Sequence, residues 1–111
     1  MNKYKFPDKF LFGTAVASYQ VEGGIYNNDW TIWENKKNSV CVEPCKEACK
    51  HYEKLDEDIE LLKNLGIRAF RFSIEWSRVE PSIGEFNDQA IKHYVEKAKK
   101  LINNGITPVI T

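Results

Sequence analysis

Two polar side chains, Gln20 and Glu22, end the segment FLFGTAVASYQVEGG (residues 10–24), which starts apolar and then thins to small residues. Small residues allow a ligand or another backbone to approach closely, so this order is typical of a strand that delivers polar groups to a site. The Gln20 amide can both donate and accept hydrogen bonds, as recognition of neighbouring sugar hydroxyls requires. A plain strand followed by a turn that either side chain caps is the alternative.

A second candidate is Arg71, in the segment AFRFSI (residues 69–74). Alternation along a strand places the two phenylalanines and Ile74 on one face and Arg71, between Ala69 and Ser73, on the other. In a closed barrel the second face points inward, near the carboxyl end of the strand, where barrel enzymes do their chemistry. A buried guanidinium there needs an anionic partner. In an open sheet Arg71 would instead face solvent.

One acidic residue and three tryptophans could also act in catalysis or sugar binding, but a structural or solvent-exposed role is the more common one for each. Glu75 is the only acid directly after the second apolar run; it could act as a general acid, but an exposed loop carboxylate is the more common outcome. Trp30, Trp33 and Trp76 could stack on a sugar ring, yet each is predicted to be a packing residue. No second carboxylate with a defined spacing accompanies Glu75.

Cys41, Cys45 and Cys49 lie close together, with His51 just beyond them. Structural zinc usually takes two ligand pairs separated by a longer loop, whereas here one evenly spaced trio is interrupted by Pro44. We therefore expect local thiols with no metal and no other cofactor, and a thiol-based metal-binding module is the alternative. An odd cysteine count without a secretion signal also argues against a disulfide framework.

Helix and strand patterns alternate along the rest of the chain. Apolar residues at steps of three and four predict a helix over Ala48–Leu65 that ends at Gly66, and a strand follows over Ile67–Ile74. Asn87 can cap a second helix, which ends at Gly105. The apolar stripe of that helix comprises Ile91, Tyr94, Val95, Ala98, Leu101 and Ile102.

The end of the first helix is repeated at the end of the second. LKNLGI (residues 62–67) aligns with LINNGI (residues 101–106) at an offset of 39 residues, and TPVIT (residues 107–111) then falls where a third strand begins. Strands and helices alternating through short loops indicate an α/β fold with parallel pairing and right-handed crossovers. Both faces of a parallel sheet are normally buried, but two crossover helices cover only one face.

Closing the sheet into a barrel would hide the other face. A (β/α)₈ barrel needs about 250 residues, and this chain has 111. We therefore predict one domain, residues 1–111, that forms about three strands of an incomplete (β/α)₈ TIM barrel and is truncated at the third strand. A small self-contained α/β domain is the alternative.

Composition narrows the possible partners. With 42% hydrophobic and 13% aromatic residues, the chain is typical of a globular protein, and its 16 basic and 16 acidic residues cancel and interleave. This charge pattern argues against nucleic acid and anionic membranes as partners. No run approaches the roughly 18 apolar residues of a membrane span, and no signal peptide is recognisable, so the expected location is cytoplasmic.

The segments above resemble those of glycoside hydrolase family 1, the β-glucosidase and β-galactosidase family. The resemblance covers essentially the whole chain from Phe6 onward. It is carried, in the family's order, by residues 10–24, 29–33 (DWTIW), 48–52 (ACKHY), 57–59 (EDI), 65–66 (LG), 71–78 (RFSIEWSR), 81 (P) and 104–111 (NGITPVIT). Three departures leave the substrate subclass open: Phe12 stands where many members have Trp, Lys50 replaces a common Asp, and the Cys41–Cys45 segment is not a family feature.

The resemblance implies a (β/α)₈ barrel that hydrolyses β-glycosides with retention of configuration. One Glu then serves as acid/base and another as nucleophile, roles that suit carboxyl groups about 5 Å apart. The family's motifs for them, Asn-Glu-Pro and Glu-Asn-Gly, do not occur in this sequence. By the same resemblance Gln20 binds glycone hydroxyls, Arg71 holds the nucleophile ionised, and Glu22 has a structural role.

The chain is thus predicted to be the N-terminal portion of a retaining β-glycosidase, inactive alone because both catalytic glutamates are missing. Its expected partners are a β-glucoside or related β-glycoside and a complementing chain that supplies the rest of the barrel. A small non-catalytic sugar-binding domain that uses Gln20 and the tryptophans is the alternative. Three parallel strands with one bare face should aggregate or remain partly unfolded.

Overall fold

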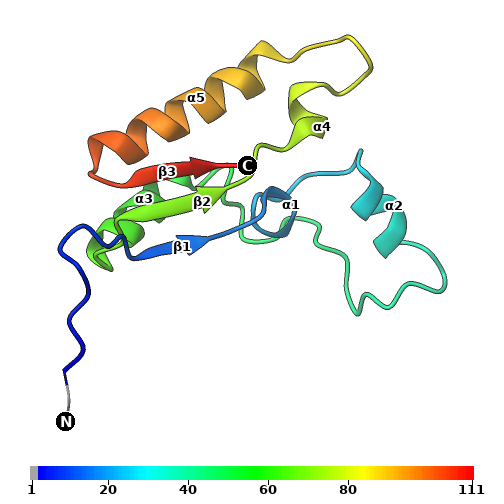
Figure 1. Ribbon diagram of the computed structural model, residues 1–111. Helices are drawn as coiled ribbons and strands as arrows, with labels where there is room; N and C mark the ends of the chain where they lie inside the picture. Colours follow the sequence, from blue (N-terminus) through cyan, green and yellow to red (C-terminus); the bar gives the residue numbers. More distant parts are fainter. Residues whose placement is uncertain (1–2) are drawn as a thin grey trace.

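The computed structural model describes residues 3–111 and places α-helices against a parallel three-stranded sheet (Figure 1). Its elements are β1 (Gly13–Ala15), α1 (Ser18–Val21), α2 (Asp29–Glu34), α3 (Leu55–Asn64), β2 (Ala69–Phe72), α4 (Trp76–Val79), α5 (Asp88–Asn103) and β3 (Thr107–Ile110). The strands lie in the order β1-β2-β3, with Ala69 of β2 opposite both Gly13 and Thr107. This arrangement confirms the predicted α/β fold with parallel pairing.

The hydrophobic core lies between β2 and the two long helices. Phe70 and Phe72 point to the face that α3 and α5 cover, and Phe72 is only 1% exposed. Burial of large apolar side chains such as these provides most of the stabilisation in a small domain. The other buried members of this cluster are Leu55, Ile59, Val79, Ala90, Tyr94, Leu101 and Ile106. The core thus fixes the helices to one face and leaves the opposite face of the sheet open.

Helix α3 begins at Leu55, seven residues later than the predicted start at Ala48. Ala48 and Lys50 adopt positive φ angles of 44° and 56°, a backbone conformation that cannot continue a right-handed helix. Long-range bonding holds the segment in turns, because the backbone N–H of His51 donates to the carbonyl of Val21 at 2.9 Å. The periodicity therefore predicted the helix correctly but not its first residues.

Both long helices end in the same way, as the sequence repeat predicted. Gly66 and Gly105 adopt φ angles of +71° and +72°, which favour glycine. The N–H of Ile67 donates to the Leu62 carbonyl at 3.0 Å, and the N–H of Ile106 donates to the equivalent Leu101 carbonyl at 2.9 Å. These bonds satisfy carbonyls that a helix end leaves unpaired, and they turn the chain into the following strand.

The start of α5 also matches its prediction. The Asn87 side chain accepts hydrogen bonds from the backbone N–H groups of Gln89 and Ala90 at 3.0 and 3.2 Å. An amide at this position satisfies N–H groups that have no partner inside the helix. The cap therefore sets where α5 begins.

The apolar stripe of α5 is only partly buried. Tyr94 and Leu101 are buried, whereas Ile91, Val95 and Ile102 are 39%, 47% and 60% exposed. The exposed part of the stripe lines an apolar groove of about 420 Å³ that also reaches α4 and β3. No further strand or helix follows β3 within residues 3–111, so this surface stays open.

The outer edge of β3 is poor in hydrogen-bond donors. The backbone N–H groups of Thr107 and Thr111 donate inward to the carbonyls of Arg68 and Phe72. The backbone nitrogens of Pro108 and Ile110, which alternate with them, therefore point outward. Proline has no N–H, which leaves Ile110 as the outward donor of this strand.

Within residues 3–111, no helix is long and apolar enough to cross a lipid bilayer.

Candidate active-site wall

Gln20 lies just beyond the carboxyl end of β1. The short helix α1 carries it, and its side chain is exposed. Together with Tyr19, Trp30 and other residues it lines a cavity of about 320 Å³. Within β1, Gly13 allows the close backbone approach that the small residues indicated, because a Cβ there would lie 2.5 Å from the carbonyl oxygen of Ala69. Within residues 3–111 the Gln20 amide has no hydrogen-bond partner, and it faces a space that could hold a small polar ligand.

Arg71 lies on the open face of the sheet, as the alternation of β2 predicts. Phe70 and Phe72 are buried beneath the helices, while Arg71 between them is exposed. It stands opposite Ala15 of β1 and Val109 of β3. Within residues 3–111 its guanidinium forms no ion pair. A charged group is thus presented on the face that would become the interior if the sheet closed into a barrel.

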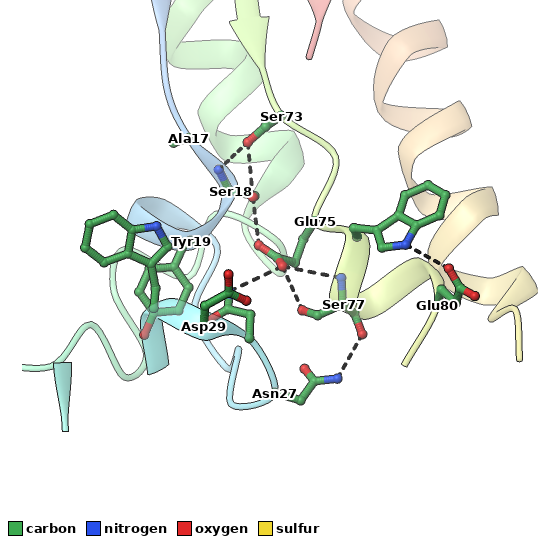
Figure 2. A pocket seen from close by; sticks show the side chains of 12 residues that line it. Ala17, Ser18, Tyr19, Asn27, Asp29, Ser73, Glu75, Ser77 and Glu80 are labelled. Atoms are coloured by element: carbon green, nitrogen blue, oxygen red, sulfur yellow. Dashed lines mark hydrogen bonds between the residues drawn. The ribbon is translucent and has the colours of Figure 1, made fainter. Parts of the chain in front are cut away.

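Glu75 lies beside a second cavity, of about 500 Å³, at the same end of the sheet (Figure 2). The carboxylate is buried and accepts hydrogen bonds from Ser18 Oγ at 2.9 Å, Asn28 Nδ2 at 3.3 Å and Ser77 Oγ at 2.7 Å. The prediction of an exposed loop carboxylate is therefore wrong. The loops that follow β1 and β2 converge here because parallel strands end at the same edge, and their donors enclose the carboxylate.

Ser73 extends this network, although its sequence context gave no sign of a role. Its hydroxyl donates to Ser18 Oγ at 3.1 Å and accepts from the backbone N–H of Ser18 at 2.7 Å (Figure 2). The chain Ser73–Ser18–Glu75 joins the end of β2 to the start of α1. Because both carboxylate oxygens accept hydrogen bonds from the surrounding loops, Glu75 is suited to positioning the two loops rather than to proton transfer.

The three tryptophans are exposed, contrary to the packing role predicted for them. Trp30, Trp33 and Trp76 are 56%, 38% and 61% exposed. Trp30 stacks on Tyr19 with ring centroids 6.5 Å apart and meets Trp33 edge-on at 5.1 Å. Trp76 donates its indole N–H to Glu80 at 2.8 Å. Part of each ring therefore remains accessible to a ligand, although Trp30 and Trp33 also contact neighbouring aromatic rings.

Glu22 is buried, in agreement with the structural role expected for it. It is 2% exposed, and it accepts hydrogen bonds from Tyr94 Oη at 2.9 Å and Arg78 Nε at 3.0 Å. Burial raises the pKa of this carboxyl, while Tyr94, Lys97 and Arg78 each oppose the rise. The network connects the loop after β1 to α4 and α5, and so sets the position of the segment that carries Gln20.

The cysteines and His51 do not assemble into one cluster. His51 Nδ1 lies 2.5 Å from Asp58 Oδ2, and no three metal-ligating side chains gather into a site within residues 3–111. Cys41 and Cys45 line the cavity that contains Gln20, whereas Cys49 lines a different one beside α3. All three thiols are free. Sequence proximity thus overstated the spatial relation of Cys49 to the other two.

Comparison with known protein families shows the family of this chain. The model of the family described as "Glycosyl hydrolase family 1" matches residues 2–111. The chain belongs to glycosyl hydrolase family 1. It is 38% identical to beta-glucosidase A of Acetivibrio thermocellus and 39% identical to beta-glucosidase A of Thermotoga maritima, with all of this chain and 26% of each relative covered.

Solved structures of the family share its fold. The beta-glycosidase of Pyrococcus horikoshii matches with a TM-score of 0.87 and 43% identity, over 96% of this chain and 25% of that protein. The beta-glucosidase of Thermotoga maritima in complex with cyclophellitol matches with a TM-score of 0.86 and 36% identity, over 96% and 26%. The chain therefore spans about a quarter of its family relatives and forms part of a (β/α)₈ barrel, as the resemblance implied.

Proposed function

We propose that this chain is the N-terminal portion of a retaining β-glycosidase that hydrolyses O-glycosyl bonds of β-glucosides or related β-glycosides in carbohydrate metabolism. We take residues 1–111 as one partial barrel domain of a cytoplasmic enzyme. The observation that carries the proposal is that Gln20 and Arg71 lie at one end and on the open face of the sheet, outside the hydrophobic core. Barrel enzymes place their chemistry at this end of the strands.

Gln20 is proposed as a hydrogen-bonding residue for the glycone. Its amide offers one acceptor and two donors, so it can bind two neighbouring hydroxyls at once. Its exposed position beside the 320 Å³ cavity supports this role. Trp30 borders the same cavity and supplies an apolar face of the kind on which a sugar ring stacks.

Arg71 is proposed to hold the nucleophilic carboxylate ionised. A guanidinium close to a carboxyl group lowers the pKa of that carboxyl, and a nucleophile must be deprotonated to attack. We propose that this carboxylate and the acid/base glutamate both lie outside the chain. The lack of an ion pair at Arg71 within residues 3–111 supports this proposal. The chain alone is then inactive.

A complementing portion of the barrel is the proposed protein partner. The exposed stripe of Ile91, Val95 and Ile102 and the unpaired edge of β3 are surfaces that a following strand and helix would cover. Apolar surface of this kind favours association over exposure to water. The coverage of a quarter of each relative is consistent with a partner that contributes the remaining strands.

The test measures release of nitrophenol from an aryl β-glucoside by this chain, by a complementing chain that carries the remaining barrel strands, and by their mixture. We expect activity in the mixture only. In the mixture, Arg71→Met should lower kcat, whereas Gln20→Ala should also raise KM, and exposed Lys37→Ala is the matched control. Turnover by the chain alone that Glu75→Gln abolishes would show that the inactive-portion proposal is wrong.

A non-catalytic sugar-binding module is a second candidate, favoured by the exposed Trp30 and Trp33 beside the cavities. It predicts saturable quenching of tryptophan fluorescence when glucose is added to the isolated, monodisperse chain. Loss of that quenching in Gln20→Ala, with no gain of hydrolysis in the mixture, would favour this module over the enzyme portion.

A further inference from the structure

Cys41 and Cys45 lie on the wall of one cavity, and the proposed glycosidase function makes no use of either thiol. Both side chains are half-buried and free, and both line the 320 Å³ space beside Gln20. The backbone bends at Val42 and Glu43, between the two cysteines. The two cysteines thus flank a bent segment and line the same space.

Hydrogen bonds hold this turn against α1 and α2. The backbone N–H of Cys45 donates to one carboxylate oxygen of Glu34 at 3.1 Å, and Tyr19 Oη donates to the other at 2.6 Å. At the other end of the turn, the N–H of Cys41 donates to Ser39 Oγ at 3.1 Å. The folded chain thus restricts where the two thiols can move relative to each other.

We propose that Cys41 and Cys45 form a dithiol site that reacts with low-molecular-weight disulfides and closes to an intramolecular disulfide. The site is specific to this pair, because Cys49 is exposed and lines a different cavity. Two thiols held in one space favour ring closure over two separate mixed disulfides.

The reaction proceeds by two thiol–disulfide exchanges. The Cys41 thiolate attacks one sulfur of the small disulfide, the S–S bond of the reagent breaks, and its other half leaves as a thiolate that takes up a proton. The Cys45 sulfur then attacks Cys41 and displaces the second half in the same way. Two protein thiols are oxidised, and one small disulfide is reduced to two thiols.

The surroundings of Cys45 set this order of attack. Burial and the neighbouring Glu34 carboxylate raise the pKa of the Cys45 thiol, which disfavours the thiolate needed for the first attack. Cys45 is therefore the resolving cysteine. Closure of the disulfide would draw together two parts of the wall that faces Gln20, and so would change the shape of the cavity.

The experiment treats the full 111-residue chain with excess oxidised glutathione, with and without denaturant, and then alkylates and maps the peptides. We expect the peptides of the folded chain to contain a Cys41–Cys45 bridge, two hydrogen atoms lighter than the reduced pair, whereas the exposed Cys49 forms at most a glutathione adduct. Formation of the bridge should be at least about tenfold faster than in denaturant, because the fold raises the effective concentration of one thiol at the other.

Three serine variants sharpen the result. Cys49→Ser should form the bridge at the unchanged rate, whereas Cys45→Ser should stop at a glutathione adduct on Cys41, and Cys41→Ser should react slowest. A bridge that involves Cys49, or a bridge that forms no faster in the folded chain than in denaturant, would overturn the proposal. Mapping of the unsubstituted chain decides this point even if a variant fails to fold.

Discussion

Glu22 is the residue on which the loop after β1 depends. Its carboxylate is nearly fully buried between Arg78 and Tyr94 and forms hydrogen bonds with both. The hydroxyl of Tyr94 also accepts the backbone N–H of Glu75 at 3.1 Å, so one side chain of α5 bonds to both acidic residues. A buried charged network of this kind is costly to break at one member, because the remaining members lose their partners.

Replacing this carboxylate should destabilise the chain strongly. We expect Glu22→Gln to lower the free energy of unfolding by about 3 kcal/mol, since Arg78 is left without its counter-charge. Denaturant unfolding followed by circular dichroism measures the change. Glu60→Gln is the control, because Glu60 pairs with Lys63 on the surface and should cost less than about 1 kcal/mol. Equal losses in the two variants would contradict the importance given to the buried network.

The buried position of His93 is expected to make the stability of the folded chain sensitive to acid. Burial, together with the positive charges of Lys97 and Arg78, lowers the pKa of His93 to about 4, and its ring stacks on Tyr52 at 3.7 Å. Between about pH 6.5 and about pH 4 the unfolded chain binds a proton that the folded chain does not. The contribution of neutral His93 to the free energy of unfolding is therefore fully present above about pH 6.5 and is lost as the pH falls towards about 4.

The variant His93→Gln tests this pH dependence. The fall in unfolding free energy between about pH 7 and about pH 5 should be smaller in the variant, because one proton-binding group is removed. Part of the fall should remain, since burial also lowers the pKa of His51. An unchanged pH profile would show that His93 is not protonated on unfolding in this range.

Among the elements, the cap of α5 offers the clearest measurement. Asn87→Ala should destabilise the chain by about 1 kcal/mol, because two backbone N–H groups lose their acceptor. Asn87→Ser keeps an oxygen at the cap and should cost much less. Unfolding by urea, monitored through helical circular dichroism, distinguishes the two. A loss in the serine variant as large as in the alanine variant would show that the cap bonds are not the cause.

Local patterns predicted the elements well where each depends on its own residues. Gly66, Gly105 and Asn87 stop or start helices through bonds to their immediate neighbours, so their effect could be predicted from the sequence. The start of α3 could not, because it depends on a bond between His51 and Val21, thirty residues earlier. Elements set by long-range contacts need the fold before their limits can be assigned.

In the candidate site, too, features set by local residues could be predicted from the sequence, whereas features set by long-range contacts could not. The open-face position of Arg71 followed from simple alternation along β2. The burial of Glu75 did not, because Ser18 and Asn28 reach it from 57 and 47 residues away. The 56% exposure of Trp30 did not follow from the sequence either, because residue type alone does not show which segments lie beside a side chain.

For the molecule as a whole, exposed apolar surface predicts self-association. The groove beside α5 is lined by apolar side chains on three elements, and an uncovered surface of this kind promotes contacts between copies. We expect the isolated chain to form oligomers at micromolar concentration. Val95→Glu combined with Ile102→Lys should shift it towards the monomer in sedimentation velocity, whereas Lys92→Glu on the exposed helix surface should not. Unchanged oligomers in the double variant would place the contact elsewhere.

Pro108 is expected to affect whether such oligomers become ordered fibrils. Fibrils grow when an edge strand of one copy continues the ladder of the next, with a donor and an acceptor at each outward residue. At the β3 edge one of the two outward donors is missing, and β1 at the other edge is only three residues long. Any aggregate should therefore be amorphous and fail to bind amyloid dyes, because the edge that a templating strand would extend interrupts its own ladder.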